Sequence, residues 1–262
     1  MAPFTPPATD LRQAFGLAQQ GEIVALVGGG GKSSLLFALG RELAAAGSRV
    51  LGTTTTRMGR DQMEQAPAVC LLSDLPQLPH HLQEAGFCLL AGELGPDKIS
   101  GVPLSLPAEL LAQGMADVVI VEADGAKLLP IKAPQSHEPV LPQGLTLLIP
   151  VAGIDALDDP IASVAHRPEL VSRLTGRSMD QPLQPEDVAL LLTHPQGGLK
   201  DAPATGRIIP FINKVETEAE MARAERIARL AADHSRVQRV VVGAALHENV
   251  VRLVVEGREA GP

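Results

Sequence analysis

The stretch EIVALVGGGGKSSLLFALGRELAAAG, residues 22–47, decides the fold class of this chain. Its first seven residues, 22–28, are mostly apolar, which is typical of a β-strand covered on both faces. Four glycines follow, and residues 32–46 then have the composition of a helix that ends at Gly47. A strand, a glycine-rich turn and a helix in this order predict the first half of a βαβ unit.

Apolar runs of strand length alternate with helical patterns along most of the chain. Further strands are predicted at 49–55, 118–122, 146–151, 208–212 and 237–242, the last clear strand, and a helix is predicted at 216–234. Pro210 interrupts one of these runs, so we expect that strand to be irregular or near an edge. The alternation predicts an α/β fold with a mostly parallel sheet flanked by helices.

The domain organisation is predicted to be simple. Residues 1–20 offer one amphipathic helix as an N-terminal extension, with Leu11, Phe15 and Leu17 on its apolar face, and 21–262 form a single domain. The pattern loosens between 59 and 114, where short apolar pieces stand among prolines and glycines. We expect an irregular insertion on the sheet there, carrying a small hairpin. A second irregular stretch, 155–185, is expected to hold short helices such as 168–174.

Composition excludes several classes of function. The chain has 262 residues, of which 45% are hydrophobic and 20% charged, so a sizeable core can form. The 30 acidic and 22 basic residues give a formal charge of −8, which argues against a surface for nucleic acid or anionic membranes. The chain has no Trp or Tyr and only five Phe, so a base-stacking platform for single strands is not expected.

The cysteines, the apolar runs and the N-terminal stretch bear on the cellular compartment in which the protein is found. Cys70 and Cys88, the only two cysteines, stand in apolar surroundings and are expected to be small buried core residues. No apolar run approaches the roughly 20 residues that span a bilayer. The opening MAPFTPPATDLRQ lacks the basic and apolar regions of a signal peptide. We therefore expect a cytoplasmic protein.

Residues 27–34, VGGGGKSS, have the features of a phosphate-binding loop. Glycines without Cβ atoms let backbone N–H groups turn toward an anion, and the helix N-terminus adds partial positive charge. Lys32 can reach the β- and γ-phosphates of ATP or GTP, and the Ser33 hydroxyl can coordinate Mg²⁺. With the loop empty, we expect the Lys32 ammonium to be solvated. The predicted nucleotide-binding residues here are Gly28, Gly29, Gly30, Gly31, Lys32, Ser33 and Ser34.

The spacing of this loop departs from GxxxxGK[ST], because Leu26 stands at the first glycine position. Read from Gly28 it is the shorter GxxGKS, which resembles the loops of Mur ligases and folylpolyglutamate synthases. The alternative is a glycine-rich turn needed only for packing. The placement between a strand and a helix favours phosphate binding and a P-loop NTPase-like fold.

Polar side chains follow two of the predicted strands. VVIVEAD, 118–124, ends in Glu122 and Asp124, which would lie in the crevice where open α/β sheets bind ligands. We expect Glu122 to hold Mg²⁺ together with Ser33, and Asp124 to orient an attacking group. In the run of threonines at 53–56, Thr54 and Thr55 are expected to meet the nucleotide. The alternatives are acidic and β-branched residues that simply finish a strand.

Residues 125–142, GAKLLPIKAPQSHEPVLP, form a proline-punctuated loop directly after the carboxylates. A loop of this length beside a site is a candidate substrate lid. It carries Lys127, Lys132, His137 and Glu138; we expect Lys127, His137 and Glu138 to face the second substrate as catalytic residues beside Asp124. A structural role for the histidine is the alternative.

Residues 211–216, FINKVE, resemble the NKxD motif with which GTPases recognise guanine, with Glu216 in place of Asp. In that interpretation Asn213, Lys214 and Glu216 bind the base. Because the segment joins a strand to a helix, helix capping explains Asn and Glu equally well.

Several strings occur together, in the order found in the YqeC family. They are VGGGGKSS, TTTTRM, VEADGAKLLPIKAPQSHEPVLP, VAGIDAL, HRPE, THPQGGLK and FINKVE, and they cover residues from about 10 to 245. The resemblance implies a P-loop-like nucleotide-binding protein that is accessory to selenium-dependent molybdenum hydroxylases. Its expected partners are a nucleotide and a molybdenum hydroxylase or the maturation factors of that enzyme.

Three functions remain open from the sequence. The leading hypothesis is a Mg²⁺-dependent NTPase or nucleotide-driven transferase that assists maturation of a molybdenum hydroxylase or its cofactor. The second is an ATP-dependent kinase or Mur-like ligase for a small acid. The third is a non-catalytic scaffold whose nucleotide-bound state recruits a partner.

Overall fold

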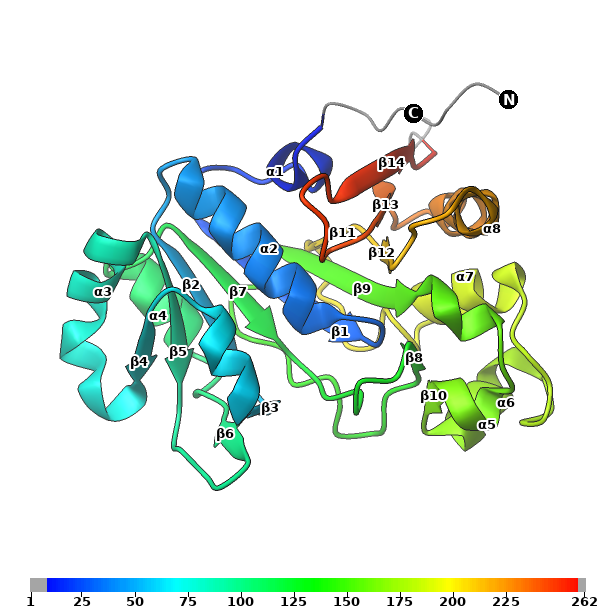
Figure 1. Ribbon diagram of the computed structural model, residues 1–262, viewed down its shortest axis with the longest axis horizontal. Coiled ribbons are helices and arrows are strands. Elements are labelled where there is room, and N and C mark those ends of the chain that lie inside the picture. The colour runs from blue at the N-terminus through cyan, green and yellow to red at the C-terminus, as the bar shows by residue number, and fades with distance from the viewer. Residues whose placement is uncertain (1–8, 259–262) are drawn as a thin grey trace.

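The computed structural model describes residues 9–258, and in it the strand that precedes the glycine loop lies at the centre of a large sheet (Figure 1). The strands of the described residues are β1 Glu22–Gly28, β2 Val50–Thr54, β3 Arg57–Gly59, β4 Val69–Leu71, β5 Phe87–Ala91, β6 Lys98–Ser100, β7 Val118–Glu122, β8 Ile131–Lys132, β9 Leu147–Gly153, β10 Ala165–His166, β11 Arg207–Ile208, β12 Phe211–Asn213, β13 Arg239–Gly243 and β14 Val251–Glu256. Its α-helices are α1 Leu11–Ala14, α2 Lys32–Ala45, α3 Leu78–Ala85, α4 Leu106–Ala112, α5 Ile161–Val164, α6 Pro168–Thr175, α7 Pro185–Thr193 and α8 Glu218–Ala232, and the 3₁₀ helices are η1 Arg60–Gln65, η2 Leu72–Gln77 and η3 Ile154–Leu157.

The main sheet has the order β14-β13-β12-β9-β1-β7-β2-β5-β4, with β11 paired to β9. All pairs are parallel except β13 with β14. From β1 the chain goes to β2 on one side and later to β9 on the other side. The order therefore reverses at β1, and open α/β sheets bind ligands at such a point, beyond the carboxyl ends of the strands.

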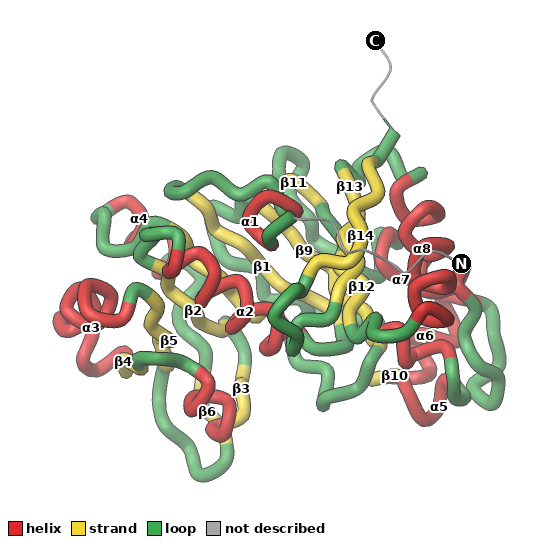
Figure 2. The backbone as a smooth tube through the Cα atoms, turned by 45° about the horizontal axis from the view of Figure 1, so that its top comes forward, coloured by secondary structure: helices red, strands yellow, loops and turns green. Residues whose placement is uncertain are grey.

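Alternate residues of the central strands are buried on opposite faces. Val24 and Leu26 of β1 pack with α1 and α2, whereas Ala25 and Val27 pack in the cluster that contains α7 and α8. Beside β2, β5 and β7 that second face is covered by α3 and α4. Figure 1 shows α2 across the front of the sheet, and Figure 2 shows α3 and α4 at one end and α5 to α8 at the other. This confirms the predicted α/β fold with a mostly parallel sheet flanked by helices.

One predicted strand differs in detail from the structure, and one further strand is not predicted from the sequence. The run at 208–212 is split into β11 and β12, and Pro210 lies in the break. Because β12 pairs with both β9 and β13, this strand is interior, and the missing N–H of the proline is accommodated by the break. Beyond the strand predicted at 237–242, β14 adds an antiparallel edge that the sequence analysis does not anticipate.

Residues 59–114, expected to form an insertion on the sheet, contribute two of its strands. β5 pairs with β2, and β4 pairs with β5 at the edge of the sheet. The expected hairpin is instead a ribbon of β3 and β6, which are far apart in sequence. The short apolar pieces give weak local signals, and only pairing with β2 shows that they extend the sheet.

The remaining predictions concern the termini and the cysteines. In the N-terminal extension, α1 and the buried Leu11, Phe15 and Leu17 are present, and residues 1–8 lie outside the described part. The predicted short helix at 168–174 is α6. Cys70 and Cys88 are buried and form no disulfide. Among residues 9–258, none of the helices combines the length and the apolarity needed to cross a membrane.

Candidate functional site

The glycine loop between β1 and α2 is shaped by close approach to neighbouring backbone. Gly28, Gly30 and Gly31 have φ values of 96°, 77° and 107°, which only glycine adopts without strain. A Cβ at Gly30 would overlap the backbone of Gly153 at the end of β9. The loop therefore requires glycine for its geometry and is held firmly against β9.

Most glycine N–H groups of the loop are already bonded within the protein. Gly28 N–H donates to Asp124 Oδ2, Gly29 N–H to Val151 O and Gly30 N–H to Leu129 O, each at 3.0 Å. Among residues 9–258, the N–H groups of Gly31 and of Lys32, Ser33 and Ser34 in the first turn of α2 have no partner. The N–H groups that can bind phosphate, called here the phosphate cradle, are therefore those at the end of the loop and the start of the helix.

Lys32 at the start of α2 is buried, with 4% of its surface exposed. Its Nζ donates to Gly28 O at 2.6 Å and lies 3.2 Å from Asp124 Oδ1 and 3.9 Å from Glu122 Oε1. Burial acts to lower the pKa of Lys32, but the two carboxylates outweigh it and hold the pKa above its ordinary value. The expectation of a solvated ammonium in the empty loop is therefore wrong.

Ser33 and Glu122 bring two oxygen atoms together beside Lys32. Ser33 Oγ donates to Glu122 Oε2 at 2.7 Å, and burial raises the pKa of the Glu122 carboxyl. Two ligands at right angles around an octahedral Mg²⁺, each about 2.05 Å from the ion, lie about 2.9 Å apart. The pair fits a magnesium ion that takes its other ligands from phosphate and water. Within residues 9–258 no group of three or more His, Cys, Asp or Glu side chains is arranged to hold a metal.

Asp124 lies beneath the loop, not in an open site. It is 2% exposed, and its carboxylate meets Gly28 N–H, Lys32 and Lys132 Nζ, the last at 3.1 Å. The residues lining the large cleft described below do not include it. Asp124 thus positions the loop and Lys32, and its contact with an attacking group stays a prediction.

A chain of buried charges continues from Asp124 to the far side of the site. The Lys132 side chain has no exposed surface, and its Nζ lies 2.8 Å from Glu138 Oε2 and donates to Gly125 O at 2.6 Å. Glu138 also accepts from both terminal nitrogens of Arg167, at 3.0 Å for Nη2. Burial alone would raise the pKa of Glu138, but the bonds from Arg167 and Lys132 lower it to about 2.

The threonines predicted to meet the nucleotide are engaged with backbone. Thr54 is 1% exposed and donates to Glu122 O at 2.8 Å, and Thr55 donates to Val140 O at 2.6 Å. Only Thr55 of this pair lines the cleft. Through its bond to Glu122 O, Thr54 ties the end of β2 to the end of β7.

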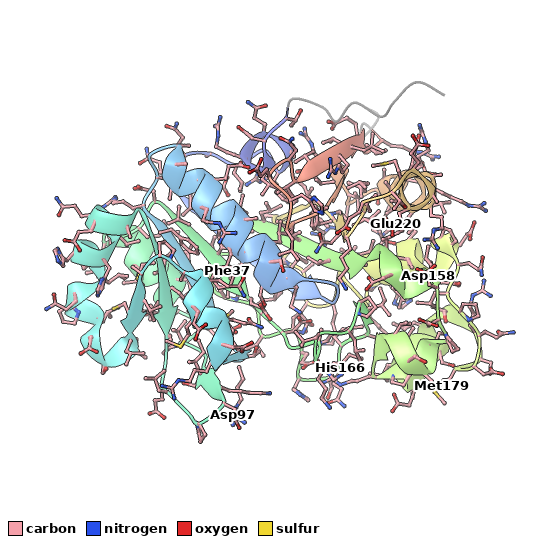
Figure 3. All side chains as sticks on the ribbon, viewed as in Figure 1. Phe37, Asp97, Asp158, His166, Met179 and Glu220 are labelled. Carbon is pink, nitrogen blue, oxygen red and sulfur yellow. The ribbon has the colours of Figure 1, made fainter. Side chains whose placement is uncertain are left out.

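A cleft of about 840 Å³ opens above the phosphate loop. Asp97, just before β6, and His166, on β10, mark its two sides (Figure 3). Burial and the positive charges of Arg167 and Lys132 lower the pKa of His166. The predicted site residues that line it are Gly30, Gly31, Lys32, Ser33, Thr55, Glu122, Lys127, His137 and Glu138.

The FINKVE residues lie at the end of β12, outside this cleft. Asn213 Nδ2 donates to Gly30 O at 2.7 Å, and its Oδ1 accepts from Ala245 N–H at 2.9 Å, so the side chain ties the phosphate loop to the end of β13. Lys214 Nζ lies 2.6 Å from Asp155 Oδ2, and Glu216 lies 3.2 Å from His247.

The capping alternative for these residues is wrong. The N-cap of α8 is Thr217, whose side chain accepts from the Glu220 N–H in a capping box. Neither Asn213 nor Glu216 accepts a bond from the first turn of the helix within the described residues. Base recognition therefore stays the prediction for this segment.

Comparison with known proteins shows the family to which this chain belongs. The sequence model of the YqeC protein family matches residues 24–169, more than half of the chain. The chain belongs to the YqeC family. The uncharacterized protein YqeC of Escherichia coli (strain K12) is 33% identical over 220 residues, which cover 82% of this chain and 85% of that protein.

Among solved structures, the crystal structure of FtsY from Mycoplasma mycoides is similar at 10% identity with a TM-score of 0.34. The match covers 85% of this chain and 52% of that one, so the chain spans about half of the FtsY length.

The part of the chain that matches the YqeC family model contains most of the site. Residues 24–169 include the phosphate loop, both strand-end carboxylates and the charged chain that ends at Arg167. The base-recognition candidates at 213–216 lie outside this match. His166 and Arg167 stand in the string HRPE, and nothing in their local pattern indicates a site role, because only the tertiary structure shows that β10 pairs with β8 beside Glu138.

Proposed function

We propose that this member of the YqeC family binds a nucleoside triphosphate with Mg²⁺ and acts as an NTPase or a nucleotide-driven transferase. One observation carries the proposal: unpaired N–H groups, the Lys32 ammonium and the Ser33–Glu122 oxygen pair meet at the floor of one cleft. Each of these groups suits a different part of a magnesium–triphosphate complex.

In this proposal each residue of the site has a separate role. The first turn of α2 receives phosphate oxygens, and Lys32 exchanges its bond to Gly28 O for a bond to the β- or γ-phosphate. Ser33 and Glu122 hold the magnesium ion, which neutralises charge on the phosphates. Asp124 keeps the loop and Lys32 in place from below.

The imidazoles in the cleft are the candidates for proton transfer. The lowered pKa of His166 favours the neutral ring at pH 7, which can accept a proton from an attacking water or hydroxyl group. His137 also lines the cleft. Glu138 is ionised at that pH with both oxygens engaged, so its proposed role is to position Lys132 and Arg167.

The cellular role in this proposal is assistance to a selenium-dependent molybdenum hydroxylase, in the cytoplasm. Support for this part comes from the family resemblance alone. The choice between ATP and GTP rests on Asn213, Lys214 and Glu216, which stand at the end of β12.

Two neighbouring serines provide a matched test of the nucleotide site. Ser33→Ala removes one of the two proposed magnesium ligands. Ser34→Ala keeps the Ser34 N–H of the phosphate cradle and removes only a hydroxyl that does not line the cleft. We expect the Mg²⁺-dependent affinity for ATP or GTP to fall about tenfold or more in Ser33→Ala, or roughly 1.4 kcal/mol, and to stay near wild type in Ser34→Ala.

Equilibrium binding of both nucleotides with and without Mg²⁺ gives this comparison, and phosphate release measures turnover. Binding that is independent of Mg²⁺ and equal in all three proteins would contradict the assignment. Tight Mg²⁺-dependent binding without phosphate release, with or without added acceptors, would favour the scaffold function over the catalytic one.

A further inference from the structure

Three basic side chains that line the cleft form no ion pair within residues 9–258. They are Arg57 on β3, Lys98 on β6 and Lys127 in the loop after β7. Most of the chain's 22 Lys and Arg side chains do pair with a carboxylate, as expected in a chain of net charge −8. Unpaired cations from three separate segments that converge on one cleft therefore suggest an anionic ligand.

Arg57 and Lys98 lie on the opposite side of the phosphate loop from the base-recognition candidates. β12, which ends in Asn213, is separated from β1 by β9, whereas β2 and the ribbon that follows it lie beyond β7 on the other side. A nucleotide whose base reaches the end of β12 would place only its phosphates in the cleft. The part of the cleft near β3 and β6 is then left for another molecule.

We propose that this part of the cleft binds a second ligand, a small acid that carries carboxylate or phosphate groups, next to the phosphates of the nucleotide. The proposal rests on the proposed nucleotide function for its geometry. Arg57, Lys98 and Lys127 would contact the acidic groups of the ligand.

The other groups in the cleft narrow the kind of acid. A volume of about 840 Å³ suits a small molecule beside a triphosphate tail. Asp61 and Asp97 also line the cleft and repel a ligand that is negative over its whole surface. Together with His137 and His166 they can accept bonds from hydroxyl or amino groups. The chemistry therefore fits an acid that also carries hydrogen-bond donors, such as a hydroxy acid or a phosphorylated alcohol.

Two double variants of the full chain test this site. Arg57→Ala with Lys127→Ala removes two cations of the cleft. Arg173→Ala with Arg252→Ala removes two cations on α6 and β14 that also form no ion pair with any described residue, and neither of these lines the cleft. The probes are citrate, a hydroxy tricarboxylate, and glycerol 3-phosphate, a phosphorylated alcohol, titrated in the presence of saturating Mg²⁺ and a non-hydrolysable nucleoside triphosphate analogue.

We expect wild type and the control variant to bind at least one probe, and the cleft variant to bind it tenfold or more weakly with unchanged affinity for the nucleotide. The probe that binds distinguishes carboxylate from phosphate recognition. Equal affinities in the three proteins, or no binding of either probe to wild type, would overturn the proposal. A loss of nucleotide affinity in the cleft variant would also overturn it, because the cations would then hold the nucleotide itself.

If the proposed nucleotide function is wrong, the titrations distinguish this from failure of the anion site. If wild type binds no nucleotide, the same titrations are made without the analogue. A tenfold difference between the two double variants would still support an anion site, and its absence would overturn the site as well.

Discussion

Lys127, in the loop after β7, and Lys132, five residues later on β8, belong to two different regions of the site. The Lys132 side chain is completely buried and meets three oxygen atoms, of Asp124, Gly125 and Glu138. Lys127 is exposed, has a φ of 51° and pairs with no carboxylate in the described part of the chain. The inner region, a chain of charges from Asp124 to Arg167, serves structure, whereas the cations of the outer region, which pair with no carboxylate within residues 9–258, are available for a ligand.

The difference teaches that burial, not residue type, decides what a charged side chain can do here. A lysine whose ammonium is desolvated must keep its partners, since an uncompensated buried charge is costly. A solvated lysine loses little when a ligand replaces water around it. The two regions should therefore respond very differently to the same substitution.

The largest expected effect is on stability at Lys132. Lys132→Met should lower the free energy of unfolding by about 3 kcal/mol or more, because it leaves Asp124 and Glu138 partly uncompensated in a buried place. Lys127→Met should change it by less than about 0.5 kcal/mol. Urea unfolding of both variants beside wild type measures the difference, and similar losses in the two variants would remove the distinction between the regions.

An effect of intermediate size on the free energy of unfolding is expected when the pH is lowered. In the folded protein the pKa of Glu138 is lowered from 4.5 to about 2, so its ionised form stabilises the fold above pH 4.5 and this contribution is lost as the pH falls toward 2. The advantage of wild type over Glu138→Gln in unfolding free energy should therefore shrink across that range.

The matched control for this pH dependence is Glu225→Gln, which alters an exposed carboxylate that pairs with Arg229 on α8. Its small difference from wild type should change little with pH. A constant difference for Glu138→Gln over the same range would show that the carboxylate is not held by its two cations.

The smallest effect is expected at the base-recognition segment, where the same contrast of buried and exposed groups recurs. Asn213 is buried and holds the loop, whereas Glu216 is half exposed and pairs with His247. If Glu216 accepts from guanine N1–H and N2–H₂, wild type should prefer GTP over ATP, but only several-fold, because a solvated pair contributes little. Glu216→Ala should remove the preference and Glu216→Asp should increase it.

Competition between GTP and ATP measures this preference in wild type and both variants. Glu218→Ala, at the start of α8, is a control that changes a nearby carboxylate outside the FINKVE segment. Equal affinities for the two nucleotides in wild type would exclude guanine recognition by Glu216.

Much of the fold could be predicted because its signals are local. β1 and β7 are continuous apolar runs, and strands buried on both faces must be apolar throughout their length. The glycine loop followed by Lys32 and Ser33 is a signal within a few residues. By contrast β4 and β5 are short, and β14 is an edge strand with partly exposed residues, so their membership in the sheet depends on pairing partners elsewhere in the chain.

The candidate site likewise has some features that local sequence signals predict and others that depend on tertiary packing. The sequence by itself determined which residues stand at the carboxyl ends of β1 and β7, because strand and loop patterns are set by neighbouring residues. Only the tertiary structure decided that Asp124 and Lys132 are buried, that Thr54 is bonded to the end of β7, and that Lys127 is exposed. The physical reason is that desolvation and pairing of a polar group depend on every segment packed around it. Arg167 meets Glu138 across 29 positions of the sequence, and Asn213 meets Gly30 across 183.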